Sequence, residues 1–202
     1  MNVNATPPQN RRPLVLVTVL FFAPLLVAFL LYYLGAWRPS RSTNRGDLIH
    51  PARSLPAIAL HDDAGKELPA EFLQHSWSLV YIGDGQCDAR CKTALADMQR
   101  ARELLGKDMS RVQSVFLASD HCCVGEFLHS IYPKLIVARV DEQNSASLVA
   151  LFPLYGNVPL SIAGRIYIVD PLGNLMMSYA PDAPSLGIYE DLKTLLNLSH
   201  IG

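Results

Sequence analysis

The strongest feature of the hydropathy pattern is an uncharged apolar run near the N-terminus. No charged side chain occurs from Pro13 to Trp37, and residues 14–34 are mostly Leu, Val, Phe and Ala. As an α-helix this run would be about 32 Å long, enough to cross the hydrocarbon core of a bilayer. Two tyrosines and Trp37 stand at its end, as in an interfacial aromatic belt. We therefore predict a transmembrane anchor over residues 1–37.

A cleaved signal peptide is the alternative reading of this run. The run is longer than a signal h-region, and the best small-residue cleavage site has Leu34 at its minus-three position, so we favour an uncleaved anchor. Two arginines precede the run and three follow it, a count that mildly opposes an outside domain. A short N-terminal anchor followed by one domain is nevertheless a common signal-anchor layout, and it favours a domain outside the cytoplasm.

The chain after the anchor divides into a linker and one domain. Residues 38–56 are rich in Ser, Arg, Asn and Pro and have no apolar periodicity, which predicts a linker. Residues 57–202 are long enough for one domain with its own core. Apart from a small hairpin over 57–68, apolar β-like runs alternate there with amphipathic helical patterns. The predicted strands are 77–82, 112–118, 135–140, 165–169 and 175–179, and the predicted helices are 88–105, 126–132, 145–152 and 188–196.

This alternation predicts an α/β fold. The order of strands and helices is that of thioredoxin, with an extra element inserted around residues 135–152. We therefore expect a thioredoxin-like three-layer sandwich preceded by one transmembrane helix.

The charges exclude one class of partner. Residues 1–46 contain five arginines and no acidic residue, so 12 basic and 18 acidic residues remain after residue 46. A mildly acidic domain behind a basic, apolar leader argues against nucleic acid and fits a domain held at a membrane. We expect the membrane, and no nucleic acid, among the partners.

The candidate chemistry is a Cys-x-x-x-Cys motif, Cys87-Asp-Ala-Arg-Cys91, between a buried strand and the start of a helix. The helix dipole and the unpaired N–H groups of the first turn favour a thiolate over a thiol. At this spacing the two sulfurs could form a disulfide or hold a soft ion such as Cu(I). The alternative is that the two cysteines have no chemical role and are core residues on the buried face of the helix.

A second group, His121, Cys122 and Cys123, follows the next predicted strand. The carboxyl ends of neighbouring parallel strands meet at one sheet edge, so these residues could approach Cys87 and Cys91. They could serve as a second thiol pair or as extra metal ligands. A loop with one buried and one incidental cysteine is the alternative.

The strand, glycine loop, Cys-x-x-x-Cys and helix resemble the Sco/SenC proteins, membrane-anchored thioredoxin-fold factors that deliver copper to cytochrome c oxidase. The stretch 166–173, Ile-Tyr-Ile-Val-Asp-Pro-Leu-Gly, resembles the Sco strand and turn that end in Asp-Pro-x-Gly. Two positions depart from the pattern. Lys92 stands where a proline commonly follows the second cysteine, and Ile162 stands where the family has its copper-ligand histidine. The chain is more similar still to an uncharacterised, proteobacterial Sco-related branch.

The resemblance implies an accessory factor for cytochrome c oxidase assembly that handles thiols or copper, with a respiratory oxidase subunit or assembly factor as partner. Cys87 would be the more exposed, nucleophilic thiol and Cys91 the resolving thiol of a thiol–disulfide oxidoreductase. Copper is the one cofactor implied, at Cys87 and Cys91. The missing histidine favours a non-catalytic Sco-like scaffold instead. No Thr-x-x-Cys pattern precedes the helix, which disfavours a peroxiredoxin.

Overall fold

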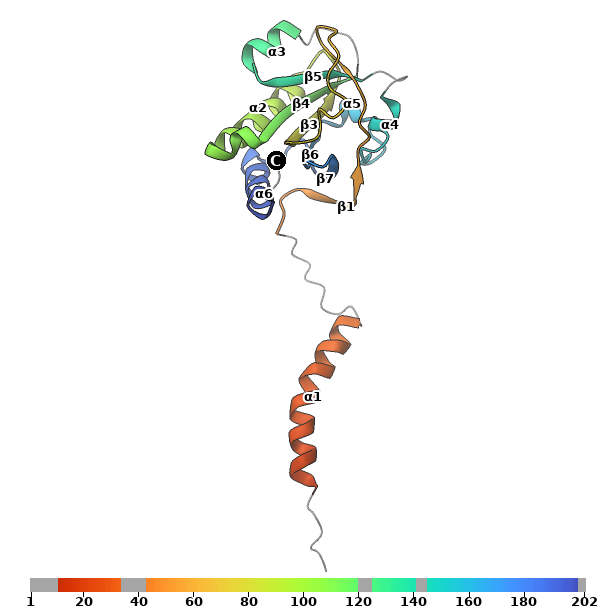
Figure 1. Cartoon of the computed structure of the whole chain (residues 1–202), viewed down its shortest axis with the longest axis vertical. Helices are drawn as coiled ribbons and strands as arrows, with labels where there is room; N and C mark the ends of the chain where they lie inside the picture. The colour runs from red at the N-terminus through yellow and green to blue at the C-terminus, as the bar shows by residue number, and fades with distance from the viewer. Residues whose placement is uncertain (1–10, 34–42, 120–124, 141–144, 200–202) are drawn as a thin grey trace, which may run out of the picture. The chain divides into compact units, whose positions relative to one another are not determined.

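The computed structural model describes residues 11–33, 43–119, 125–140 and 145–199. The chain divides into two units, Met1–Thr43 and Asn44–Gly202. The first contains helix α1 (Arg12–Tyr33), whose residues are all exposed and which includes Pro24 (Figure 1). By length and composition α1 could cross a membrane, a property that an N-terminal signal sequence shares.

The second unit is built on one seven-stranded mixed sheet with the strand order β1-β7-β6-β3-β4-β5-β2 (Figure 1). Strands β3, β4 and β5 run parallel, and every other pairing is antiparallel. The strands are β1 (Asp47–Ser54), β2 (His61–Asp62), β3 (Trp77–Gly83), β4 (Val112–Ala118), β5 (Leu135–Arg139), β6 (Ile166–Val169) and β7 (Asn174–Tyr179). Central strand β3 is buried along its whole length, which explains its continuous apolar run.

The prediction that residues 38–56 form a linker is wrong for its second part, because β1 pairs with β7. Residues 44–56 therefore belong to the folded unit. Only Ile49 of the eight residues of β1 is buried, so the sequence of this edge strand does not alternate between buried apolar and exposed polar residues. Such alternation is the pattern by which a strand is predicted. Strand β1 is held by long-range contacts instead. One is the ion pair between Asp47 and Arg165, whose guanidinium also stacks on the ring of Tyr155.

Helices cover the two faces of the sheet unequally. The longer ones, α2 (Ala89–Leu104) and α6 (Ser185–Leu198), pack together on one face, and α3 (Gly125–Ile131) contacts β5. The predicted helix over 145–152 is a single turn, α4 (Ala146–Val149). A short helix absent from the predictions, α5 (Leu160–Ala163), contacts β3, and the 3-10 helix η1 (Gly106–Arg111) follows α2.

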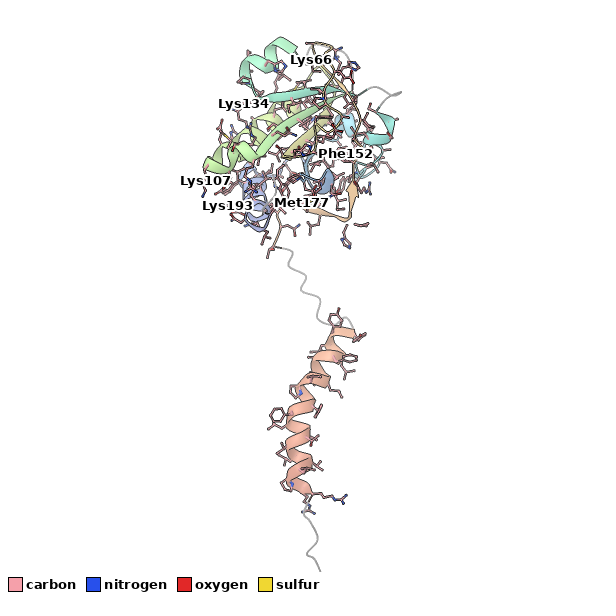
Figure 2. The ribbon with its side chains drawn as sticks, viewed as in Figure 1. Lys66, Lys107, Lys134, Phe152, Met177 and Lys193 are labelled. Atoms are coloured by element: carbon pink, nitrogen blue, oxygen red, sulfur yellow. A yellow bond between two sulfur atoms is a disulfide. The ribbon has the colours of Figure 1, made fainter. Side chains whose placement is uncertain are left out.

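Two apolar clusters form the core, one on each face of the sheet. Met177 belongs to the cluster under α2 and α6, and Phe152 belongs to the cluster on the other face. Both lie inside the domain in Figure 2, whereas the labelled lysines Lys107, Lys134 and Lys193 lie at its rim. The α/β thioredoxin-like layers are thus those that the sequence predicts.

Candidate functional site

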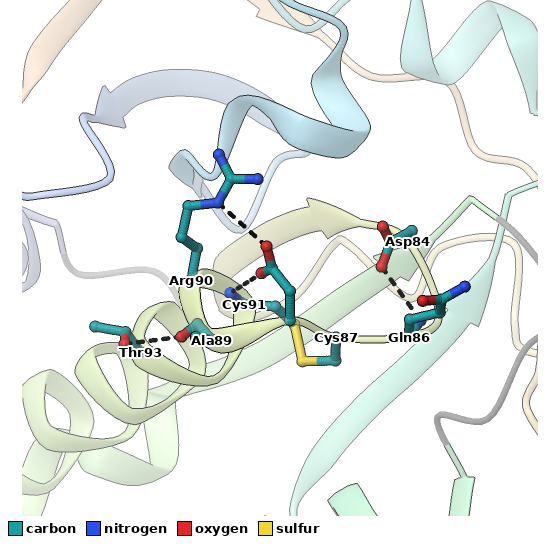
Figure 3. Close-up of a disulfide and its surroundings, with 8 residues drawn as sticks. Asp84, Gln86, Cys87, Ala89, Arg90, Cys91 and Thr93 are labelled. Atoms are coloured by element: carbon teal, nitrogen blue, oxygen red, sulfur yellow. Dashed lines mark hydrogen bonds and ion pairs between the residues drawn. A yellow bond between two sulfur atoms is a disulfide. The ribbon is translucent and has the colours of Figure 1, made fainter.

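The Cys-x-x-x-Cys motif lies in the loop between β3 and α2 and in the first turn of α2 (Figure 3). Gly83, the last residue of β3, lies close to the ring of Tyr81, since a Cβ there would come within 2.7 Å of that ring. The Asp84 carboxylate then accepts a hydrogen bond from the Gln86 N–H at 3.2 Å, and the Asp84 carbonyl accepts one from the Cys87 N–H at 3.3 Å. These bonds turn the chain from the sheet edge into the helix.

Cys87 and Cys91 are joined by a disulfide with their Cα atoms 5.0 Å apart. Both side chains are buried, 4% and 2% exposed, in the apolar cluster that contains Tyr81 and Phe116. Cys87 has a positive φ of 45°, a left-handed conformation that costs energy for a residue with a side chain. Cys87 is only slightly more exposed than Cys91 in this disulfide, because the loop folds its sulfur against the core, and its role as the nucleophilic thiol stays a prediction.

Asp88 caps α2 and places a negative charge beside the disulfide. Its carboxylate accepts a hydrogen bond from the Cys91 N–H at 3.0 Å, and it forms an ion pair with Arg90 at 3.2 Å. The bond from the Cys91 N–H lowers the pKa of Asp88, with the Arg90 guanidinium adding to the effect. Asp88 is therefore ionised at neutral pH, at the helix end that would otherwise stabilise a thiolate.

The inner side of the motif faces α5 and Tyr81. A hollow of about 10 Å³ is lined by Cys91, Tyr81, Asp88 and, from α5, Ile162. Arg90 reaches across to the carbonyl of Ile162 at 3.4 Å. Burial and the nearby Asp88 charge raise the pKa of Tyr81 to about 12, so its phenol stays protonated at neutral pH. The hollow admits about one water molecule and no substrate.

Tyr81, Asp88 and Arg90 are site residues that sequence reasoning did not single out. Asp88 carries a local signal, because an aspartate just before a helix is a common N-cap. Tyr81 carries none, because an aromatic residue inside a buried strand is ordinary core. Ile162 was placed by the family pattern, and the structure brings it to the cysteines.

Among the described residues at the motif, the donors available to copper are the two cysteines. Once reduced, two thiolates could hold Cu(I), which accepts low coordination. The third family position is Ile162, whose side chain has no donor atom, and the Asp88 carboxylate is already engaged. Among the residues that the structure describes, no group of three or more His, Cys, Asp or Glu side chains could hold a metal ion. A Cu(II) site that needs imidazole therefore does not fit the described residues.

The second predicted group, His121, Cys122 and Cys123, lies outside the described residues. The strand that precedes it ends beside the motif: Ala118 of β4 pairs with Gly83 of β3, and the Ser119 N–H donates to the Gly83 carbonyl at 2.9 Å. The proximity of these three residues to Cys87 and Cys91 stays a prediction.

Comparisons with known proteins agree with this geometry. A model of the family described as "Transmembrane-like, thioredoxin-like, C-terminal domain" matches residues 77–199. No curated protein matches at a significant level. Solved structures share the fold at low identity. Apo Sco1 of Thermus thermophilus is 20% identical over 78% of this chain and 99% of its own, with a TM-score of 0.62.

Two copper-bound structures are similar in the same way. Copper-bound ScoI of Bradyrhizobium japonicum is 20% identical over 71% of this chain and 99% of its own, with a TM-score of 0.55. Copper-bound yeast Sco1 is 18% identical over 73% of this chain and 95% of its own, with a TM-score of 0.59. The likeness establishes a Sco-like thioredoxin fold.

Proposed function

The chain belongs to the family of transmembrane-like, thioredoxin-like C-terminal domains, and from this premise we propose that it is a membrane-anchored thiol–disulfide exchange factor of the Sco kind. Cys87 and Cys91 carry the reaction. The observation that supports this best is their disulfide at the carboxyl end of central strand β3, where α2 begins. Ligand and redox chemistry in α/β sheets gathers at this edge.

The proposed reaction transfers two electrons from a partner dithiol. One partner thiolate attacks a sulfur of the Cys87–Cys91 bond, which breaks as a mixed disulfide forms and the other cysteine leaves as a thiolate. The second partner thiol, on losing its proton, attacks the mixed disulfide and frees the remaining cysteine. The partner ends as a disulfide and this protein as a dithiol. Since both sulfurs are buried, the loop 84–87 must move before the attack.

Copper enters the proposal as cargo of the reduced state. Solved Sco structures include copper-bound forms, and two thiolates here could carry Cu(I). The resemblance to Sco proteins suggests cytochrome c oxidase assembly as the setting, with an oxidase subunit or assembly factor as partner. We place the domain on the periplasmic side of a bacterial inner membrane, anchored by α1.

A non-catalytic scaffold is the second candidate, and two observations favour it. Neither sulfur is exposed, and the position of the missing third ligand is occupied by Ile162. In that case Cys87 and Cys91 would only stabilise the loop, and the domain surface would bind the assembly partner.

The two candidates separate in one experiment on the full chain in nanodiscs. Equilibration with graded dithiothreitol, followed by alkylation and mass spectrometry, measures how readily the Cys87–Cys91 bond is reduced, with Cys122 and Cys123 followed on their own peptides. Exchange predicts reversible reduction. For Cys91→Ser and a model peptide in its disulfide form, it predicts a mixed disulfide, because the Cys87 thiolate attacks the peptide disulfide and one peptide sulfur leaves as a thiolate. In the native cell, Cys87→Ser should lower oxidase activity. Unchanged oxidase activity in cells that carry a folded Cys87→Ser protein would favour the scaffold.

A further inference from the structure

A second recess lies at the opposite end of the parallel strands from the disulfide. It has a volume of about 240 Å³ and is lined by residues of α2 and of the first parts of β4 and β5. Figure 1 shows where α2, β4 and β5 lie in the domain. Two of its wall residues, Ser114 and Leu135, pair at the N-terminal ends of these strands. The cysteine motif follows the carboxyl end of β3, so the recess is separate from the redox chemistry.

Two polar atoms of this wall are buried and have no hydrogen-bond partner in the described part of the chain: Ser114 Oγ and Arg102 Nε. Ser114 is only 7% exposed, and its neighbours across the sheet are Leu79 and Leu135. Buried polar groups in folded proteins almost always have partners, and leaving one without a partner is costly. The two donors therefore indicate a missing acceptor.

The charges around the recess indicate the nature of that acceptor. Arg102 forms no ion pair among the described residues. Burial lowers the pKa of its guanidinium, and the nearby Glu103 charge offsets only part of this effect. Glu103 is itself engaged, since it accepts a hydrogen bond from Gln99 at 2.7 Å. Lys134 adds a second cation at the rim (Figure 2). The acceptor that fits is an anion.

The rest of the wall is mainly apolar and includes Leu95, Met109 and Leu135. We propose that this recess binds the carboxylate of a small amphipathic organic acid, with Arg102 and Ser114 donating to the carboxylate and the apolar wall covering its hydrocarbon body. One partly buried guanidinium, whose Nε is buried, and one buried hydroxyl match a singly charged carboxylate. A phosphate dianion would leave more charge without donors in an apolar recess.

The test measures binding of trifluoromethylphenylacetate to the full chain in nanodiscs by ¹⁹F NMR. The neutral amide of this acid is the matched probe. Empty nanodiscs show how much of each compound partitions into the lipid. The acid should bind and the amide should bind at least tenfold more weakly. Arg102→Gln should weaken binding of the acid about tenfold, and Ser114→Ala several-fold. Arg100→Gln, which removes a charge from the exposed side of the same helix, should leave it unchanged.

Folding is checked separately. Ser114→Ala removes an unpaired hydroxyl, so its thermal midpoint should equal or exceed that of the wild type. Equal binding of acid and amide, an equal loss with Arg100→Gln, or no binding of the acid would each overturn the proposal. A peptide ending in Phe, with a free or an amidated C-terminus, distinguishes the source. Tighter binding of the peptide with a free C-terminus than of the acid identifies the natural ligand as a polypeptide C-terminus. Binding of the acid but not of the peptide identifies it as a small molecule.

Discussion

The carboxylate of Asp88 acts on the cysteine pair in two opposing ways. As the N-cap of α2 it accepts the Cys91 N–H and stabilises the helix that carries the motif. As a negative charge it opposes thiolate formation at the same helix end. The residue-scale chemistry of the site therefore depends on a balance between the helix dipole and this carboxylate.

The substitution Asp88→Asn separates the two effects, because asparagine is also a good N-cap but has no charge. Once the disulfide is reduced, we expect the Cys87 and Cys91 thiols of this variant to ionise more readily than those of the wild type, and the disulfide to become easier to reduce. The rate of iodoacetamide labelling against pH, read on the motif peptide by mass spectrometry, measures the change. Asp97→Asn, a charge removal on the same helix, is the control. An unchanged labelling profile would show that the Asp88 charge does not reach the sulfurs.

Ile162 gives a second residue-scale prediction. It lines the hollow beside Cys91 and is 47% exposed, so Ile162→His should cost less than about 1 kcal/mol. With the cysteines reduced, it should raise Cu(II) affinity at least tenfold, since it adds an imidazole to two thiolates. Thiolate-to-copper charge-transfer absorption measures the binding. Ile131→His, at a position 46% exposed on α3, is the matched control.

The outcome that contradicts this prediction is specific. Tight Cu(II) binding by the wild type that is lost with His121→Ala would show that the segment 121–123 supplies the third ligand. The family-based placement of the ligand at Ile162 would then be wrong for this chain.

At the scale of elements, strand β1 is attached by Asp191 of α6. The Asp191 carboxylate accepts hydrogen bonds from the N–H groups of Arg45 and Gly46 and from the hydroxyl of Tyr179, each at 2.9 Å. Gly46 is close to the same tyrosine, because a Cβ there would lie 2.6 Å from the Tyr179 ring. The segment that enters the domain from α1 is thus held by one buried acid.

Asp191→Ala should remove about 3 kcal/mol from the free energy of unfolding, because it leaves three donors without an acceptor, two of them buried and the Arg45 N–H partly buried. Amide hydrogen exchange should also accelerate at residues 45–48. Urea unfolding and exchange mass spectrometry measure the two effects. Glu190→Ala, which removes only the exposed ion pair with Arg45, should cost less than about 1 kcal/mol. Similar costs for the two variants would show that β1 is held by its pairing with β7 alone.

At the scale of the whole molecule, buried tyrosines predict sensitivity to alkali. Burial raises the pKa of Tyr81 and Tyr167 to about 12 and also raises that of Tyr179, where the Asp191 charge adds to the effect. Unfolded tyrosine ionises near pH ~10. The folded state therefore keeps these tyrosines protonated to a higher pH than the unfolded chain does. The stabilisation is fully present below pH ~10 and is lost as the pH rises towards about 12.

Tyr81→Phe should reduce that alkaline loss by up to about 3 kcal/mol. Urea unfolding of wild type and variant from pH 8 to pH 12 measures it, and the difference at pH 8 gives the packing cost of the substitution alone. Parallel curves over the whole range would show that Tyr81 ionises as readily in the folded state as in the unfolded chain.

The orientation in the membrane is the other whole-molecule prediction. We expect the domain outside the cytoplasm, because the apolar helix is long and N-terminal. C-terminal fusions to alkaline phosphatase, which folds only outside, and to β-galactosidase, which is active only inside, measure it. An inactive phosphatase with an active galactosidase would reverse the topology and would also remove the oxidising compartment from the proposed redox chemistry.

Local patterns were sufficient for most of the fold. Strand β4 lies where its apolar run predicts it, and α2 and β3 agree with prediction to within a residue at each end. These segments have hydrophobic periodicity of their own, and central parallel strands are continuous apolar runs. The position of Cys87 and Cys91 between strand and helix followed from the same pattern.

Other features depend on contacts that no local pattern records. Strand β1 is a polar edge strand held by β7 and by Asp191, more than 100 residues away in the chain. Ile162 lies in the hollow beside Cys91 because α5 folds back onto β3. The two sulfurs are buried because the first turn of α2 and the loop before it pack them against β3 and β4, in the cluster that contains Tyr81 and Phe116. The sequence by itself determined the anchor-like helix, the α/β layers and the cysteine motif, because each depends on periodicity or spacing within a segment. Tertiary structure alone decided the burial of the cysteines, because the residues that cover them come from segments distant in sequence, whereas the charges of Asp88 and Arg90 lie within the motif.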